Sequence, residues 1–233
     1  MEFLIDNPET EKKYKKILAA IPSMQNGITA SGMEARGIKY EKNWGVSTVD
    51  LKQYASQFEK DHLLALKLWN KKWRETMILA TLLDEPKKLT EEQMDFWVKT
   101  SENTDIIEQA VLNLFTESPF AFIKALEWCR GKKHLVKCAS LLMMGRMALT
   151  SSQDIDEMFE SFFDVLPPLA KDPKLYTLFF RSVCQLARRS HYMNEQCVSF
   201  AQTLLELEEE NAIKLGNELI TEITSEHFQS AIK

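Results

Sequence analysis

Apolar residues recur at intervals of three and four along most of this chain, in long stretches that contain neither glycine nor proline. This spacing is typical of amphipathic helices, whereas a half-buried strand requires strict alternation, of which we find none. The sequence therefore predicts an all-α fold of about ten helices. The predicted helices cover residues 8–21, 47–55, 61–69, 72–83, 90–100, 104–115, 119–129, 133–149, 153–165, 173–189 and 193–208.

Local signals mark where several of these helices begin. Short polar side chains stand just before three apolar-periodic stretches, where each can accept a hydrogen bond from the first turn: Ser47 or Thr48, Asp61 and Thr90. Gln93 follows Thr90 at the spacing of a capping box, so its side chain is placed to reach back. Residues 22–47 are less regular and hold four of the seven glycines, and residues 35–47 are predicted to form a connecting loop.

Taken in pairs, the helices recur at about 30–40 residues, the length of a helical-hairpin repeat. Because the repeats share no consensus, periodicity alone fits an irregular bundle as well as a solenoid. We expect one domain over residues 1–233, with N-terminal helices and a loop (1–46), helix-pair repeats (47–208) and a C-terminal capping helix (209–233).

The four cysteines form no metal-binding or disulfide framework and are interpreted as small buried apolar residues in a reducing compartment. The N-terminus turns acidic too early for a secretory signal, and no apolar run reaches the roughly 18 residues of a membrane span. We therefore expect a soluble, cytoplasmic protein.

The net charge of −5 argues weakly against a nucleic-acid binder, but charge is unevenly distributed. Basic residues dominate 124–148 and 171–189, and acidic residues dominate 150–165 and 195–222. If basic and acidic helices alternate with the helix pair, a stacked array would present one basic face, as a phosphate-binding protein needs. The alternative is that these charges merely solvate exposed helices.

Four segments together resemble the AlkD-like DNA alkylation repair family. They are GIKYEKNWGVSTVDLKQYA, HLLALKLWNKKWRETMILATLL, TEEQMDFW and ENTDIIEQ, and the resemblance extends over about residues 38–190. Its most recognisable features are Gly45-Val46, Leu68-Trp69 and Arg74-Glu75. The resemblance implies HEAT-like antiparallel helix pairs stacked into a curved α-solenoid. It also implies a basic concave groove for duplex DNA and hydrolysis of the N-glycosidic bond of N3- or N7-alkylated purines.

The residues that match the family's active site depart from its pattern. The family's aromatic-Asp-x-x-Asp run falls at Thr104 to Glu108, so the aromatic is lost and the catalytic Asp becomes Glu108, with Asp105 the other carboxylate. A family arginine falls at Lys137, or at Lys133, and a stacking tryptophan falls at Gln185. Either this branch has altered or lost glycosylase activity, or the true register differs by one helical turn.

Other residue groups have simpler structural interpretations. Trp69, Trp73, Trp97 and Trp128 fit a helical core better than a platform for bases. Arg74-Glu75 is interpreted as a buried or interhelical ion pair. His134 and Cys138 could share a helix face, but two ligands do not make a metal site.

The sequence thus predicts a DNA alkylation repair protein that binds duplex DNA, alkylated DNA in particular, as a monomer without metal, cofactor or membrane. The predicted catalytic residues are Glu108 and Asp105, and the predicted DNA-binding residues are Lys133, Lys137, Arg146, Arg181, Gln185 and Arg188. The alternative is an inactive helical-repeat scaffold that binds nucleic acid or protein partners.

Overall fold

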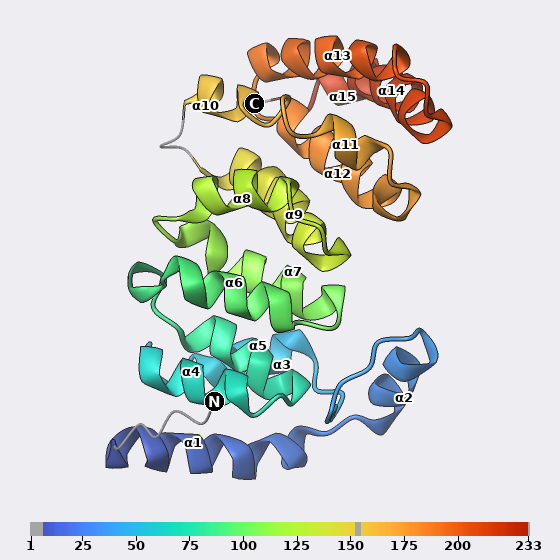
Figure 1. Ribbon diagram of the computed structural model, residues 1–233. Helices are drawn as coiled ribbons and strands as arrows, with labels where there is room; N and C mark the ends of the chain where they lie inside the picture. The colour runs from blue at the N-terminus through green and yellow to red at the C-terminus, as the bar shows by residue number, and fades with distance from the viewer. Residues whose placement is uncertain (1–6, 152–154, 233) are drawn as a thin grey trace. The chain divides into compact units, whose positions relative to one another are not determined.

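The computed structural model describes residues 7–151 and 155–232, and all regular structure in these ranges is helical (Figure 1). The one pairing of extended backbone found there is an isolated parallel bridge between Lys42 and Trp73. Within the same ranges, no helix combines the length and apolarity that a membrane span requires. The predicted all-α class is confirmed. The chain divides into two compact units, which we call unit 1 (Met1–Pro119) and unit 2 (Phe120–Lys233) and describe separately.

Over its described residues, 7–119, unit 1 consists of seven helices joined by short turns and one longer loop. They are α1 (Pro8–Ala20), α2 (Gly27–Ala35), α3 (Thr48–Ala55), α4 (His62–Asn70), α5 (Arg74–Leu83), α6 (Glu91–Thr100) and α7 (Thr104–Asn113), with single 3-10 turns at Ile21–Met24, Pro86–Lys88 and Phe115–Glu117. Residues 36–47 form the connecting loop that the sequence predicts. The helix α2 differs from the prediction, because the sequence predicts irregular structure over these residues.

The predicted N-caps of unit 1 are confirmed, and of the two candidates for α3 it is Ser47 that caps, because Thr48 is the first residue of the helix. The side chains of Ser47, Asp61 and Thr90 accept hydrogen bonds from the first turns of α3, α4 and α6. The capping box is only half formed, because the Gln93 side chain donates to Asp84 Oδ2 at 2.7 Å. Because Asp84 is fully buried, its carboxylate needs a hydrogen-bond donor, so the Gln93 amide bonds Asp84 instead of completing the capping box.

The core of unit 1 surrounds α5, which packs against α3, α4 and α7. Every residue of α5 except Leu82 is buried. On α4 and α6, Trp69 and Trp97 stack with ring centroids 4.0 Å apart and planes 1° from parallel. Both rings are buried, which confirms them as core residues, whereas Trp73 is half-buried and contacts Trp44 edge-on.

Unit 2 contains four long helices and several short ones. They are α8 (Ala121–Cys129), α9 (His134–Thr150), α10 (Asp156–Glu160), α11 (Pro167–Ala170), α12 (Tyr176–Ala187), α13 (His191–Leu205), α14 (Glu210–Ile223) and α15 (Glu226–Gln229), with a 3-10 turn at Pro173–Leu175. The helix α9 packs between α8 and α12, and α12 packs in turn against α13 and α14. Trp128 of α8 is buried, as predicted.

Two glycines allow helices of unit 2 to approach closely. A Cβ atom at Gly145 of α9 would lie 3.2 Å from Ser182 Cα and 2.1 Å from Gln185 Oε1, both on α12. A Cβ atom at Gly216 of α14 would lie 2.7 Å from the carbonyl oxygen of Ala201 on α13. The absence of side chains at these points therefore fixes how close α12 and α14 lie to their neighbours.

Two predicted helices of unit 2 differ from those observed. The described part of 153–165 holds only α10 followed by turns, and residues 152–154 lie outside the described ranges. The turns bury Phe162, Val165 and Leu166, so this apolar segment packs without continuing the helix. Residues 209–233 hold two helices, α14 and α15, where the sequence predicts one. Ser225 separates them by capping α15 with its side chain.

Candidate nucleic-acid interface

The connecting loop of unit 1 is fastened to the beginnings of α5 and α7 by polar contacts. Asn103, which precedes α7, bonds Lys39 twice: its Oδ1 accepts from the Lys39 amide at 3.1 Å, and its Nδ2 donates to the Lys39 carbonyl. The Arg74 amide donates to the Lys42 carbonyl at 2.9 Å. These contacts hold a segment without regular structure against two helix N-termini.

The Arg74-Glu75 pair holds the far end of the same loop. Glu75 is fully buried, and its carboxylate accepts from the amide of Trp44, at 3.1 and 3.2 Å to its two oxygens, and from that of Val46 at 3.3 Å. Arg74 is also buried, and its Nη1 donates to the Val46 carbonyl at 2.9 Å. The two charged groups lie 3.5 Å apart. The interpretation of this pair as a buried ion pair is confirmed. The structure shows in addition that the pair binds the backbone of the connecting loop.

Asp105 belongs to this network as well. Its Oδ2 accepts from Arg74 Nε and from the Tyr40 hydroxyl, each at 2.9 Å. Burial and the nearby Asp105 carboxylate raise the pKa of Tyr40 far above its ordinary value, so the hydroxyl keeps its proton. Asp105 therefore serves to hold the first turn of α7 against the loop.

Glu108 lies one helical turn beyond Asp105 on α7 and is exposed to solvent. Thr104, where the family pattern has an aromatic residue, is the first residue of α7 and is also exposed. Of the two carboxylates predicted to act in catalysis, Glu108 is the one that a substrate in solution can reach.

In unit 2, three of the predicted DNA-binding residues lie on one side of α12. Arg181, Gln185 and Arg188 follow each other at four and three residues, so they share a helix face. Arg181 is exposed and the other two are half-buried. We call these three residues the α12 stripe.

Arg188 at the end of the α12 stripe has an unusual environment. Its guanidinium carbon lies 4.8 Å from the centroid of the Phe228 ring. Its Nε atom is buried, and among the described residues it has no hydrogen-bond partner. A buried donor without an acceptor is costly, and an anionic oxygen is the acceptor that a guanidinium prefers.

The predicted residues on α9 do not all lie together. Lys133 is the exposed residue that precedes α9, whereas Lys137 and Arg146 are half-buried within it. Nine residues span about two and a half turns, so Lys137 and Arg146 point to opposite sides of α9. The Arg146 side carries other half-exposed residues: Leu135, Leu142 and Leu149. On the Lys137 side, His134 one turn earlier is exposed, and the residues further along the helix are buried: Leu141, Met144 and Ala148.

Several basic residues counted in the sequence are used inside unit 2. Arg189 donates to the carbonyls of Ala148 and Ser151, at 3.2 and 2.8 Å, and so satisfies the C-terminal end of α9. Its Nε also donates to Asp156 at 2.6 Å. Lys124 is buried and pairs with Glu127 at 2.6 Å. The basic character of 124–189 is therefore partly internal.

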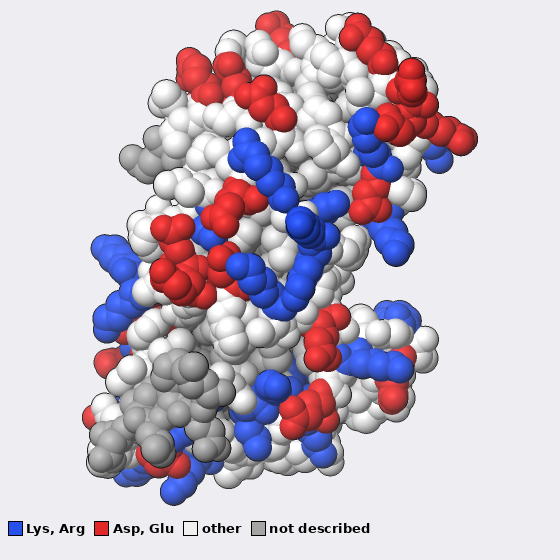
Figure 2. Space-filling view, in the orientation of Figure 1, with Lys and Arg blue, Asp and Glu red and all other residues white. Residues whose placement is uncertain are grey.

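The acidic residues are not confined to a separate layer of helices. The helix α14 packs against α12 and carries Glu210, Glu218 and Glu222, so the predicted alternation of basic and acidic helices holds only in part. Figure 2 shows acidic side chains gathered over the turn between α13 and α14. Burial, together with the nearby Glu218 carboxylate, raises the pKa of Tyr176 on α12 to about 12.

The cysteines of the chain are all free and buried, as predicted. Burial raises the pKa of Cys129 to about 11 and that of Cys184 to about 12, so these thiols stay protonated. Cys138 Sγ lies 3.5 Å from His134 Nε2. In the part of the chain that the structure describes, no group of three or more ligand-type side chains surrounds them or any other point.

Comparisons with known proteins place this geometry in context. Residues 17–173 match a family model described as DNA alkylation repair enzyme, which overlaps most of the predicted 38–190 span. A solved structure matches with a TM-score of 0.69 and 18% identity, covering 81% of this chain and 82% of that one. That protein belongs to a family described as related to the HEAT-like repeat DNA glycosylases with affinity for branched DNA structures. This likeness confirms the HEAT-like fold of helix pairs. A comparison with curated proteins found no match.

Proposed function

This chain belongs to the DNA alkylation repair family, and from that premise we propose that it binds duplex DNA through the α12 stripe. The observation that carries the proposal is Arg188, whose buried Nε has no acceptor among the described residues and whose guanidinium is held against Phe228. A phosphate oxygen supplies the missing acceptor once the half-buried Arg188 side chain turns outward, and exposed Arg181, two turns earlier on the same side, reaches a second phosphate.

On α9 we propose that Arg146, rather than Lys137, faces the DNA. The side of α9 that carries Arg146 is half-exposed along its length, whereas the side that carries Lys137 is exposed only in the first turn and is buried from Leu141 onward. The two residues form a matched pair for a test, because each substitution by alanine removes one positive charge from the same helix.

The test is binding of labelled duplex DNA, measured by fluorescence anisotropy at several salt concentrations. Arg181→Ala, Arg188→Ala and Arg146→Ala should each weaken binding and reduce the salt slope by about one unit, since each removes one phosphate contact. Lys137→Ala should have a smaller effect. Lys12→Ala, at an exposed position of α1, is the control for loss of charge alone.

Arg188→Lys separates charge from geometry. Lysine keeps the charge and the contact with the Phe228 ring but lacks the guanidinium fork, so binding should fall between that of the wild type and that of Arg188→Ala. Binding that ignores salt and all three arginine substitutions would remove the proposal. It would favour the alternative of a protein-binding scaffold.

Excision of alkylated purines is the second candidate function, and exposed Glu108 on α7 favours it. An N3- or N7-alkylated purine is already cationic and a good leaving group, so a carboxylate beside the sugar suffices to stabilise the positive charge that develops. Glu108 stands where the family resemblance places the catalytic Asp, but Thr104 and Gln185 lack the aromatic rings of that pattern. We therefore expect slow excision.

Release of N3-methyladenine and N7-methylguanine from methylated duplex DNA measures this activity. Glu108→Gln should abolish release while leaving DNA binding intact. Glu117→Gln, an exposed carboxylate in the turn after α7, is the matched control. Undiminished release by the Glu108 variant would mean that another group performs the chemistry.

A further inference from the structure

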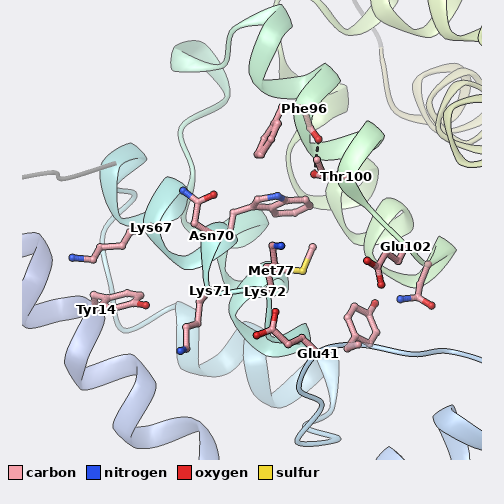
Figure 3. Close-up of a pocket in the computed structure, with 13 residues that line it drawn as sticks. Tyr14, Glu41, Lys67, Asn70, Lys71, Lys72, Met77, Phe96, Thr100 and Glu102 are labelled. Atoms are coloured by element: carbon pink, nitrogen blue, oxygen red, sulfur yellow. Dashed lines mark hydrogen bonds between the residues drawn. The ribbon is translucent and has the colours of Figure 1, made fainter. Parts of the chain in front are cut away.

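Unit 1 contains a cleft of about 880 Å³ that the DNA-binding proposal does not use. It is lined by α4, the turn between α4 and α5, the end of α6, and the start of the connecting loop. Figure 3 shows Tyr14 and Lys67 on one side of it and Glu102 on the other, with Lys72 and Met77 between them. The volume lies in the range of sites that bind small organic molecules.

The apolar part of the cleft is aromatic and rigid. Trp69 lines it and is held in place by stacking on Trp97 at 4.0 Å, with only 3% of its surface exposed. Phe96, on the next helix, is 49% exposed at the edge of the cleft, which is high for a residue of this size. The cleft therefore offers an exposed ring beside a fixed aromatic floor, an arrangement suited to a flat ligand.

The polar part of the cleft supplies amides and positive charge. Asn70 and Asn103 line it, and Lys67, Lys71 and Lys72 outnumber Glu41 and Glu102. Lys67 is paired with Glu11, and the Lys71 amine lies 4.8 Å from the centroid of the Trp73 ring. Lys72 is the one non-glycine residue with a positive φ, of 58°, in the described ranges. A lysine rarely adopts this backbone conformation, and its side chain lies in the middle of the cleft (Figure 3).

We propose that this cleft holds one unpaired nucleotide of a DNA strand. This proposal rests on the proposed DNA-binding function and extends it from duplexes to strands that end or separate. The base stacks on the exposed ring of Phe96, Asn70 is placed to bond its edge, and Lys72 holds the adjoining phosphate. Glu102 repels phosphate from the opposite side, so the phosphate is favoured on the side of Lys72.

Tyr40 connects this cleft to the beginning of α7. Its ring lines the cleft, while its hydroxyl donates to Asp105 at 2.9 Å. Asp105 stands one turn before the candidate catalytic carboxylate. A nucleotide in the cleft therefore contacts a side chain that also fixes the first turn of α7, so the cleft recognises DNA close to the candidate site within the same unit.

The test compares a blunt duplex with the same duplex carrying a short single-stranded thymidine tail, both labelled and measured by anisotropy. The wild type should bind the tailed duplex more tightly. Phe96→Ala should reduce that advantage about fivefold or more and leave blunt-duplex binding unchanged, because stacking on an aromatic ring contributes about this much per base. Lys72→Gln should reduce the same advantage. Ile123→Ala, an exposed apolar residue of unit 2, is the control and should change neither substrate.

The outcomes separate this proposal from the proposed function. Variants of the α12 stripe should weaken binding of both DNAs by the same factor, whereas the cleft variants should alter only the ratio between them. A wild type without preference for the tail, or a ratio unchanged by both cleft substitutions, overturns the proposal while duplex binding stands. Photo-crosslinking with iodouridine in the tail gives a second readout. The adduct should map to the peptides of Tyr40, Trp69 or Phe96, and an adduct confined to unit 2 overturns the proposal.

Discussion

Replacement of Glu75 by alanine should destabilise unit 1 by about 2–5 kcal/mol. The carboxylate is fully buried and is the acceptor for the amides of Trp44 and Val46. Its removal leaves the buried amide of Val46 and the part-buried amide of Trp44 without an acceptor. A fully buried donor without an acceptor costs about 1–3 kcal/mol, and a part-buried one costs less. Arg74 adds little to the loss, because Asp105 still pairs with it at 2.9 Å. A larger loss would apply if Arg74 were left as an unpaired buried charge.

Urea unfolding followed by tryptophan fluorescence measures this free energy for unit 1. Of the five tryptophans, four precede Pro119 and only Trp128 follows it, so the signal reports unit 1 almost alone. Glu75→Gln keeps the volume and one acceptor oxygen, and should therefore cost less than Glu75→Ala. Glu59→Ala, an exposed carboxylate of the same unit, is the control and should lie within about 0.5 kcal/mol of the wild type.

A cost of less than about 1 kcal/mol for Glu75→Ala would refute this prediction, because it is below the penalty for a single unpaired buried donor. Equal costs for Glu75→Gln and Glu75→Ala would refute it as well, since the remaining oxygen of the amide would then contribute nothing. Either result would mean that water reaches the amides of Trp44 and Val46 as soon as the carboxylate is removed.

Three further predictions concern single residues. Lys72→Gly should stabilise unit 1 by about 1 kcal/mol in the same urea assay, because glycine adopts the φ of 58° without the clash that a Cβ causes. A loss of stability would show that the Lys72 backbone is not strained. Gly216→Ala should lower the stability of unit 2 by about 1–3 kcal/mol in thermal unfolding followed by circular dichroism, since its Cβ would lie 2.7 Å from the Ala201 carbonyl, and an unchanged melting temperature would refute this. Burial raises the pKa of Asp84 above its ordinary value of 3.8, although the bond from His62 opposes the shift. The folded carboxyl thus holds its proton more tightly than the unfolded one. The protonated Asp84 therefore contributes to stability below pH 3.8, and this contribution is lost as the pH rises through the raised pKa. The free energy of unfolding of the wild type relative to Asp84→Asn should therefore fall over that pH window, and a rise would refute the argument.

The parts of the fold that could be predicted from the sequence depend on local chemistry. Ser47, Asp61 and Thr90 cap helices within three residues of themselves, so a short window contains both partners. The helix α2 was missed because Gly27 and Gly32 suggest a loop, whereas the Asn26 cap and the small side chains around it suffice for a helix.

The site was harder to predict because its partners are distant in the sequence. Arg74-Glu75 could be interpreted as a buried pair, but the loop residues that complete it lie about 30 positions earlier, and no spacing rule connects them. Tyr40 and Asn103 were missed for the same reason, although both stand in segments that carry the family resemblance. Counts of basic residues overestimated the positive charge available to DNA, because some of these residues bond the protein itself. Arg189, for example, donates to carbonyl groups at the C-terminal end of α9.

The connecting loop also determines how unit 1 should open under native conditions. Its residues from Lys39 to Val46 are held mainly by directional bonds to Asn103, Arg74 and Glu75, and only Gly45 and Val46 among them are buried. Such a segment should detach as one cooperative piece at a lower free energy than the helices beneath it. Hydrogen exchange should then show the amides of Trp44 and Val46 losing protection together, ahead of the α5 amides.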